Sequence, residues 1–228
     1  MQNTEFDQLV DKNSINPGLQ MFEKRVSGMF LGEILRRVLL SLIDRNRLFN
    51  GRSSDILDKQ HGIDTSPMSG IAEDSSPHLK KVQEIIAKTF GISDPSAEEC
   101  RAVKLVSDAI ARRSARFAAV AVSAVAFHSG RFASATPQKP VDIGADGSLV
   151  EFYPNYVQMC LSACEEILGS GADKRLRIGL AKDGSGVGAA LYLDFDVTLM
   201  LDVHYRPRNK RKMVSYFASP FCSLVSRL

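Results

Sequence analysis

Two polar side chains near the N-terminus have the types and the spacing suited to binding a polyol. Gln20 and Glu23 follow Asn16-Pro17, where a capping side chain precedes a proline that fits the first turn of a helix. A helix from Pro17 toward Ser27 would place Gln20 and Glu23 on one face, because they are three positions apart. A carboxylate accepts hydrogen bonds from hydroxyls strongly, and a sugar offers adjacent hydroxyls. From the spacing alone, the alternative is that Glu23 is a surface charge and Gln20 caps the chain locally.

A glycine-rich segment farther along the chain could approach a phosphate. The sequence Asp-Gly-Ser-Gly-Val-Gly-Ala-Ala-Leu occupies residues 183–191, directly after a predicted strand. Glycines let backbone N–H groups come close to a phosphate or a ribose, and a helix N-terminus adds about half a positive charge. A glycine-rich stretch after a strand is also often only a turn. Both interpretations stay open on this motif alone.

Helices must position the first of these motifs. Apolar residues recur at helical spacing from Phe30 to Ile43, which predicts a helix directly after the Gln20 and Glu23 segment. Residues 50–77 are rich in Gly, Ser, Asp and Pro and predict loops with one short helix after Ser53. Another helix is expected from Ser76-Pro77 to about Gly91. A capping box at Ser96 and Glu99 begins a long helix that continues to about His128, and its second half is apolar nearly all round.

The strands are expected in the last third of the chain. Two short apolar segments, 141–143 and 149–152, flank Ala-Asp-Gly-Ser at 145–148 and predict a β-hairpin, in which Asp146 is first a turn residue and second a ligand. A helix from Tyr153-Pro154 through Leu168 and a strand over 176–180 follow. The pattern predicts an α/β protein in which helices outnumber strands, and residues 191–228 are left unassigned.

Composition limits the classes of function. Of 228 residues, 44% are hydrophobic and 24% charged, which is typical of a globular protein. The net charge is +3 and five of the seven residues from Arg206 to Lys212 are basic, so the body of the chain does not indicate nucleic-acid binding. That basic run is interpreted as a solvated tail or, alternatively, a nuclear-localisation signal. The longest apolar run, 117–127, is too short to span a membrane, and we expect a cytoplasmic protein with reduced cysteines and no metal site.

The order of residues near the N-terminus closely resembles the signature of the hexokinase and glucokinase family. The matching residues are Glu5-Phe6-Asp7, Val10-Asp11, Ser14, Asn16-Pro17-Gly18, Gln20, Glu23-Lys24, Ser27-Gly28 and Leu31-Gly32-Glu33. The segments 111–119, 145–156 and 183–191 are also similar to family segments, so the resemblance extends from about Glu5 to Leu191. It implies the C-terminal half of a hexokinase large domain, with an actin-like ATPase or ribonuclease H-like fold, many helices and a small mixed sheet. We assign residues 1–190 to this partial domain and 191–228 to a divergent tail.

The resemblance also implies roles for individual residues. Glu23 and Gln20 would contact the hydroxyls of a hexose, in a pocket shared with the turn at Gly184. Gly28, beside Met29, would lie near the nucleotide phosphates, where some relatives have a lysine in place of the methionine. Arg112 and Ala118 stand where relatives have Thr and Ser that contact the nucleotide, and Arg112 could pair with phosphate or fill part of the adenine site. The loop that would line ATP consists of Gly184, Ser185, Gly186 and Gly188.

The implied reaction is transfer of a phosphoryl group from ATP, with Mg²⁺, to the 6-hydroxyl of glucose in glycolysis. In the family the catalytic aspartate, the lobe that closes over the sugar and the first phosphate loops precede the matched segment. We therefore expect no catalytic residue in this chain, little or no activity by itself, and self-association through an exposed sheet edge. The alternative is a non-catalytic protein that binds sugar and regulates a full-length kinase.

Overall fold

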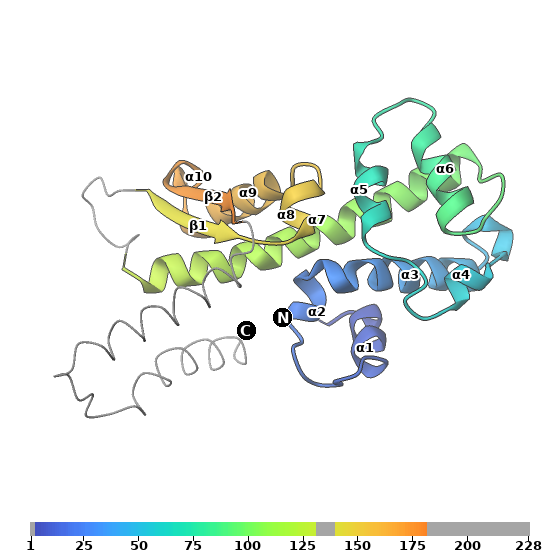
Figure 1. Ribbon diagram of the computed structural model, residues 1–228, viewed down its shortest axis with the longest axis horizontal. Coiled ribbons are helices and arrows are strands. Elements are labelled where there is room, and N and C mark those ends of the chain that lie inside the picture. Colours follow the sequence, from blue (N-terminus) through green and yellow to red (C-terminus); the bar gives the residue numbers. More distant parts are fainter. Residues whose placement is uncertain (1–2, 131–139, 182–228) are drawn as a thin grey trace, which may run out of the picture. The chain divides into compact units, whose positions relative to one another are not determined.

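The computed structural model describes residues 3–130 and 140–181. Helices dominate this part of the chain, and two short strands lie near its end (Figure 1). The elements in chain order are α1 (Glu5–Lys12), α2 (Glu23–Val26), α3 (Gly28–Asp44), η1 (Phe49–Gly51), α4 (Asp55–Asp58), α5 (Ser66–Glu73), α6 (Lys80–Thr89), α7 (Ala97–His128), β1 (Val141–Ala145), α8 (Ser148–Phe152), α9 (Tyr156–Leu168), α10 (Ala172–Arg175) and β2 (Leu176–Leu180).

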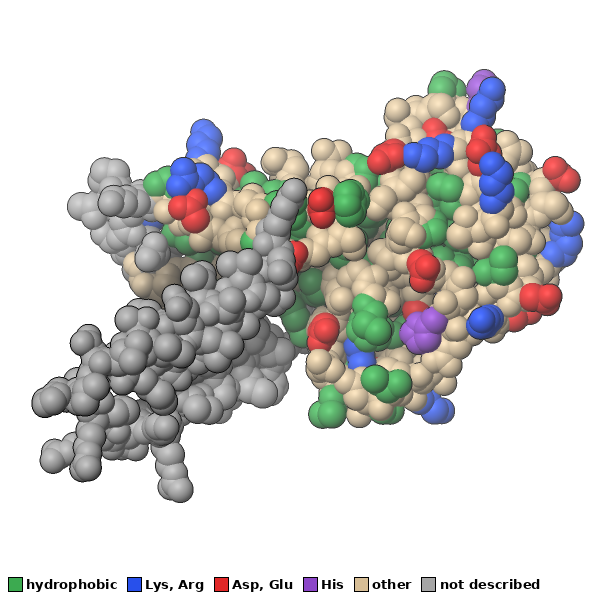
Figure 2. Space-filling model, viewed as in Figure 1, with side chains coloured by type: hydrophobic (Ala, Val, Ile, Leu, Met, Phe, Trp, Pro, Cys, Tyr) green, Lys and Arg blue, Asp and Glu red, His purple; other side chains and the backbone are tan. Residues whose placement is uncertain are grey.

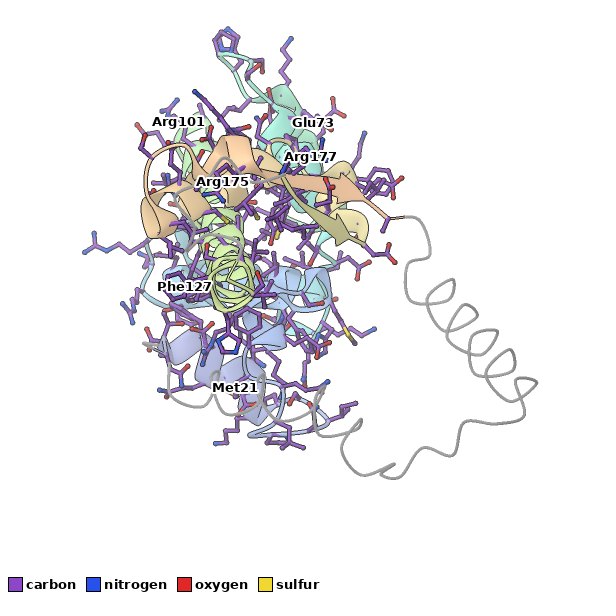
Figure 3. The ribbon with its side chains drawn as sticks, turned by 90° about the vertical axis from the view of Figure 1, so that its left-hand side faces the viewer. Met21, Glu73, Arg101, Phe127, Arg175 and Arg177 are labelled. Atoms are coloured by element: carbon purple, nitrogen blue, oxygen red, sulfur yellow. The ribbon has the colours of Figure 1, made fainter. Side chains whose placement is uncertain are left out.

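The long helix α7 runs through the described unit and packs against α2, α3, α5, α6 and α9 (Figure 1). The Ser96 hydroxyl accepts from the Glu99 N–H and the Glu99 carboxylate accepts from the Ser96 N–H, so the predicted capping box is confirmed. Helices α5 and α6 pack against the first half of α7, whereas α9 packs along the second half. Figure 3 looks along α7 and places Phe127 near its C-terminal end.

Small side chains let α9 approach α7 closely. Ala115 and Ala119 are fully buried, and their carbonyl oxygens accept from the thiols of Cys160 and Cys164 at 3.4 and 3.7 Å. The two cysteines therefore share one face of α9. Burial raises the pKa of Cys160 to about 12, so this thiol is a packing group rather than a nucleophile.

Helix α3 carries much of the core. It begins after Ser27, whose hydroxyl accepts from the Met29 N–H, and this confirms the helix predicted from Phe30 to Ile43. The buried stripe of α3 faces α1, α2 and α7, and it includes Leu31, Ile34, Leu35, Leu39 and Ile43.

The two strands pair in parallel, with Val141 opposite Leu176 and Ala145 opposite Leu180. Figure 2 shows acidic and basic side chains next to each other over these strands, where the Arg177 guanidinium donates to Asp142 at 2.7 Å. The predicted hairpin is wrong. Gly147 turns the chain with a φ of +114°, and residues 148–152 then form helix α8, in which Leu149 is buried and Glu151 N–H donates to the Gly147 carbonyl.

An ion pair joins α1 to α7 across 106 residues of sequence. The guanidinium of Arg113 donates to both oxygens of Asp7 at 2.9 and 2.8 Å, and the same carboxylate accepts from Thr4. Burial acts to raise the pKa of Asp7, but the hydrogen bonds from Arg113 and Thr4 together lower it by a larger amount. The pKa of Asp7 therefore lies below its ordinary value of 3.8.

Asp7→Asn should therefore lower the free energy of unfolding at pH 7 by about 1.5–3 kcal/mol. Because the folded-state pKa is depressed, the contribution of the pair is complete well above the ordinary value of 3.8 and is lost as the pH falls through the folded-state pKa. Urea denaturation of the wild-type and Asp7→Asn proteins at pH 7 and at pH 3 measures how much their free energies of unfolding differ at each pH. Equal stabilities of the two proteins at pH 7 would contradict the prediction.

Candidate functional site

The segment from Asn16 to Phe22 forms turns instead of the predicted helix. Gly18 and Gln20 have φ values of +81° and +53°, which a right-handed helix does not permit. The Gly18 N–H donates to the carboxylate of Asp11, seven residues earlier, at 3.0 Å. A side-chain acceptor thus competes with helix formation here, and only Glu23–Val26 form the helical turn α2.

The structure nevertheless brings Gln20 and Glu23 together. The Gln20 amide Nε2 donates to Glu23 Oε2 at 2.8 Å, and the Asn16 amide donates to Gln20 Oε1. Both Gln20 and Glu23 are exposed, and Asn16 is half-buried. These three side chains present a row of donors and acceptors that suits a ligand with several hydroxyls. Asn16 was expected only as a helix cap, although its place in the motif was the signal for a role beside Gln20.

Contacts with α7 and α8 hold the end of this segment. The Ser114 hydroxyl of α7 contacts the Val26 carbonyl oxygen at 2.9 Å and the Tyr156 hydroxyl at 2.7 Å. A Cβ atom at Gly28 would lie 3.2 Å from Leu149 Cγ and 3.7 Å from Ser148 Oγ. The start of α3, where the resemblance predicts phosphate contacts, therefore lies against α8. Met29 next to it is exposed.

Arg112 lies on another side of α7. It is exposed and two residues from Ser114, so its side chain leaves the helix about 200° around from the one that contacts Val26. Two neighbouring arginines of α7 form ion pairs, Arg113 with Asp7 and Arg116 with Glu166. Ala118 is half-buried in the core.

The predicted loop of Gly184, Ser185, Gly186 and Gly188 lies outside the described residues. The expected pocket between Glu23 and Gly184 is therefore not part of the described structure, in which Glu23 is exposed. Within residues 3–130 and 140–181, no three histidine, cysteine, aspartate or glutamate side chains gather to hold a metal ion. None of the helices in this part of the chain combines the length and the hydrophobicity that a membrane-spanning helix requires.

Similarity to known proteins shows which family the chain belongs to. The family model described as "Hexokinase" matches residues 1–194. The chain belongs to the hexokinase family. It is 44% identical over 206 residues to a protein named glucokinase from Aspergillus niger, covering 84% of this chain and 40% of the relative. It is 39% identical over 188 residues to hexokinase-7 from Oryza sativa, covering 82% and 40% of the two chains.

A solved structure supports the fold of this hexokinase-family chain. A hexokinase from Schistosoma mansoni in complex with glucose superposes with a TM-score of 0.72 at 26% identity, covering 82% of this chain and 40% of that one. The predicted fold class, part of a hexokinase with its actin-like ATPase fold, is thereby confirmed. The chain spans about 40% of the length of the curated relatives named above.

Proposed function

We propose that this chain supplies the hexose-contacting part of an ATP-dependent hexokinase that phosphorylates the 6-hydroxyl of glucose. The observation that carries the proposal is the hydrogen bond between Gln20 and Glu23 in an exposed turn of the family motif. The glucose bound to the related structure from Schistosoma mansoni supports glucose as the hexose.

The arrangement of the two side chains has a chemical consequence. Since the Gln20 amide already donates to Glu23 Oε2, an incoming sugar hydroxyl would donate to Oε1 of the same carboxylate. The hydrogen bond from the amide also favours one orientation of the carboxylate, so less conformational entropy is lost when a sugar binds. Asn16 extends the row through Gln20 Oε1 and could meet a second hydroxyl.

For the nucleotide, we propose contacts from Gly28 at the start of α3, from Arg112, and from the loop with Gly184, Ser185, Gly186 and Gly188. ATP with Mg²⁺ would supply the phosphoryl group, and transfer needs a hydroxyl in line with the γ-phosphate and a carboxylate that accepts the hydroxyl proton. In this proposal the described residues of the chain hold the sugar and do not supply that base.

Replacing Glu23 by alanine should weaken glucose binding by about tenfold to a hundredfold, because one charge-assisted hydrogen bond contributes about 1.5–3 kcal/mol. Isothermal titration of the 228-residue chain with glucose measures the change. Glu84→Ala is the matched control, since Glu84 is an exposed carboxylate whose described ion pair is with Lys88. Equal affinities of the Glu23→Ala and Glu84→Ala proteins would reject Glu23 as the hexose contact.

The 228-residue chain by itself should show no glucose phosphorylation above background in a coupled assay with MgATP. A general base contributes about 10²- to 10⁴-fold to a rate, and the proposal assigns that base to the part of a hexokinase that precedes the segment matched here. Glucose binding without turnover is expected of both candidates, so the second one, a sugar-binding protein that regulates a full-length kinase, is favoured only if the added chain also changes the rate of a full-length hexokinase in the same assay. Turnover comparable to that of a full-length family member would refute the predicted inactivity.

A further inference from the structure

An ion pair between Asp11 and Lys24 contacts the backbone of the turn that carries Gln20 and precedes Glu23. We propose that Asp11 and Lys24 are positioning residues for hexose binding, which fix the turn from Asn16 to Gln20 so that its polar side chains face solvent. This inference rests on the proposed function for its ligand, but its structural half stands on contacts within the chain.

Asp11 holds the middle of the turn. Both oxygens of its carboxylate accept from the Gly18 N–H at 3.0 Å, and Oδ1 also accepts from the Lys24 ammonium at 2.7 Å. Gly18 has a φ of +81°, so the backbone at this point depends on glycine and on an acceptor outside the turn. The carboxylate comes from the last turn of α1, which packs on α3. The turn is thereby attached to the core.

Lys24 holds the beginning of the turn. Its side chain is only 3% exposed, and its ammonium donates to Asp11 Oδ1 and to the Asn16 carbonyl oxygen at 2.7 and 2.8 Å. Lys24 follows Glu23 directly in α2, and successive side chains of a helix point about 100° apart. The two side chains therefore point in different directions, so that the Lys24 ammonium is buried and the Glu23 carboxylate is exposed.

The free-energy cost of burying the Lys24 ammonium indicates that its ion pair with Asp11 has a specific role. A buried ammonium is costly unless it is paired, and here two oxygens with charge or partial charge compensate it. The exposed ion pair between Glu5 and Arg45 also starts from α1, but its atoms are 3.7 Å apart and its side chains are about two-thirds exposed. That pair has no such contact with the turn among the described hydrogen bonds, so it provides a matched control.

Amide hydrogen exchange of the 228-residue chain tests the structural half. In Asp11→Asn and in Lys24→Met, the Gly18 amide should exchange about tenfold faster or more than in the wild-type protein, while the amides of Ala111 and Ala115 in α7 keep their rates. Glu5→Gln should leave the Gly18 rate unchanged. An unchanged Gly18 rate in both pair variants, or an equal increase in Glu5→Gln, overturns the inference. If Lys24→Met does not fold by circular dichroism, Asp11→Asn decides alone.

Isothermal titration with glucose tests the functional half on the same proteins. Asp11→Asn should lower the melting temperature, because the buried Lys24 ammonium loses its charged partner. At a temperature where circular dichroism shows all the proteins folded, Asp11→Asn should bind glucose about tenfold more weakly and Glu5→Gln should bind like the wild type. Faster Gly18 exchange with unchanged glucose affinity overturns the positioning role. Absence of glucose binding by the wild type rejects the proposed function instead, and the exchange rates still decide whether the pair fixes the turn.

Discussion

Glu33→Ala should lower the free energy of unfolding by about 3–5 kcal/mol, because it leaves a buried guanidinium without its partner. Glu33 and Arg36 are 2% and 1% exposed. Arg36 donates to both carboxylate oxygens of Glu33 at 2.6 Å, and Arg37 donates to one of them at 2.9 Å. The fourth donor is the backbone N–H of His61 at 2.9 Å. Removing the carboxylate therefore leaves four donors without their acceptor.

The same network attaches a loop to the first turns of α3. Arg36 donates to the Leu57 carbonyl oxygen, and the His61 contact comes from the loop that follows α4. Gln60 of this loop donates to the Asn13 carbonyl oxygen at 2.6 Å, close to the turn that carries Gln20. Loss of Glu33 should consequently loosen both the loop and its contact with the candidate hexose site.

Denaturant unfolding at pH 7 measures the effect of Glu33→Ala, with Glu84→Ala as the control for removing an exposed carboxylate. The double variant Glu33→Leu with Arg36→Met should be less destabilised than Glu33→Ala, since it leaves no unpaired buried charge. A Glu33→Ala protein as stable as Glu84→Ala would show that the network contributes nothing to folding.

Gly32→Ala should lower the free energy of unfolding by about 1–3 kcal/mol, although alanine is normally the better residue inside a helix by about 0.5–1 kcal/mol. A Cβ at Gly32 would lie 2.5 Å from the Asp64 carbonyl carbon and 2.6 Å from the Ile63 oxygen. These atoms are backbone, so a rotamer change cannot relieve the contact. The displaced loop would also lose the hydrogen bond from Gly32 N–H to the Thr65 hydroxyl at 2.8 Å.

Thermal and denaturant unfolding of Gly32→Ala measure whether the substitution lowers the free energy of unfolding. Gly179→Ala is the matched control, because a Cβ at Gly179 would meet no atom within 4 Å. Its stability should stay within about 0.5 kcal/mol of the wild type. If Gly32→Ala is as stable as Gly179→Ala, or more stable than the wild type, the loop over residues 63–65 does not pack on α3 as the structure has it.

Elements with strong local signals were predicted correctly from the sequence. The capping box at Ser96 and Glu99 and the periodicity up to His128 gave α7, and the apolar stripe from Phe30 gave α3. The predictions that failed depended on distant partners. Nothing local in Asn16-Pro17 shows that Asp11 captures the Gly18 N–H and turns the chain out of a helix. In residues 145–152, Asp-Gly is a good hairpin turn, yet burial of Leu149 is satisfied by helix α8 instead.

The loop-rich interpretation of residues 50–77 was also incomplete. Helix α5 begins with Ser66 and Pro67 and buries Met68 and Ile71, which are too few apolar residues to give a clear periodic signal in sequence. Helix α1 went unpredicted, although Thr4 and Asp7 form a capping box at its start.

For the candidate site, the spacing of Gln20 and Glu23 was sufficient to predict that they meet, even though the predicted helix between them is absent. Asp11 and Lys24 were recognisable only as part of the motif, because the burial of an ammonium cannot be read from a sequence. The roles of Gly184, Ser185, Gly186 and Gly188 stay predictions, as does that of Arg112.

Hexose binding by the Gln20 and Glu23 segment is tested most directly by an amide NMR titration of the isotopically labelled 228-residue chain with glucose. Binding there predicts saturable shifts of the amides in residues 16–24, absent in Glu23→Ala, while the amides of α6 do not move. Saturable shifts confined to other elements, or no shift anywhere at high glucose concentration, would contradict hexose binding by this turn.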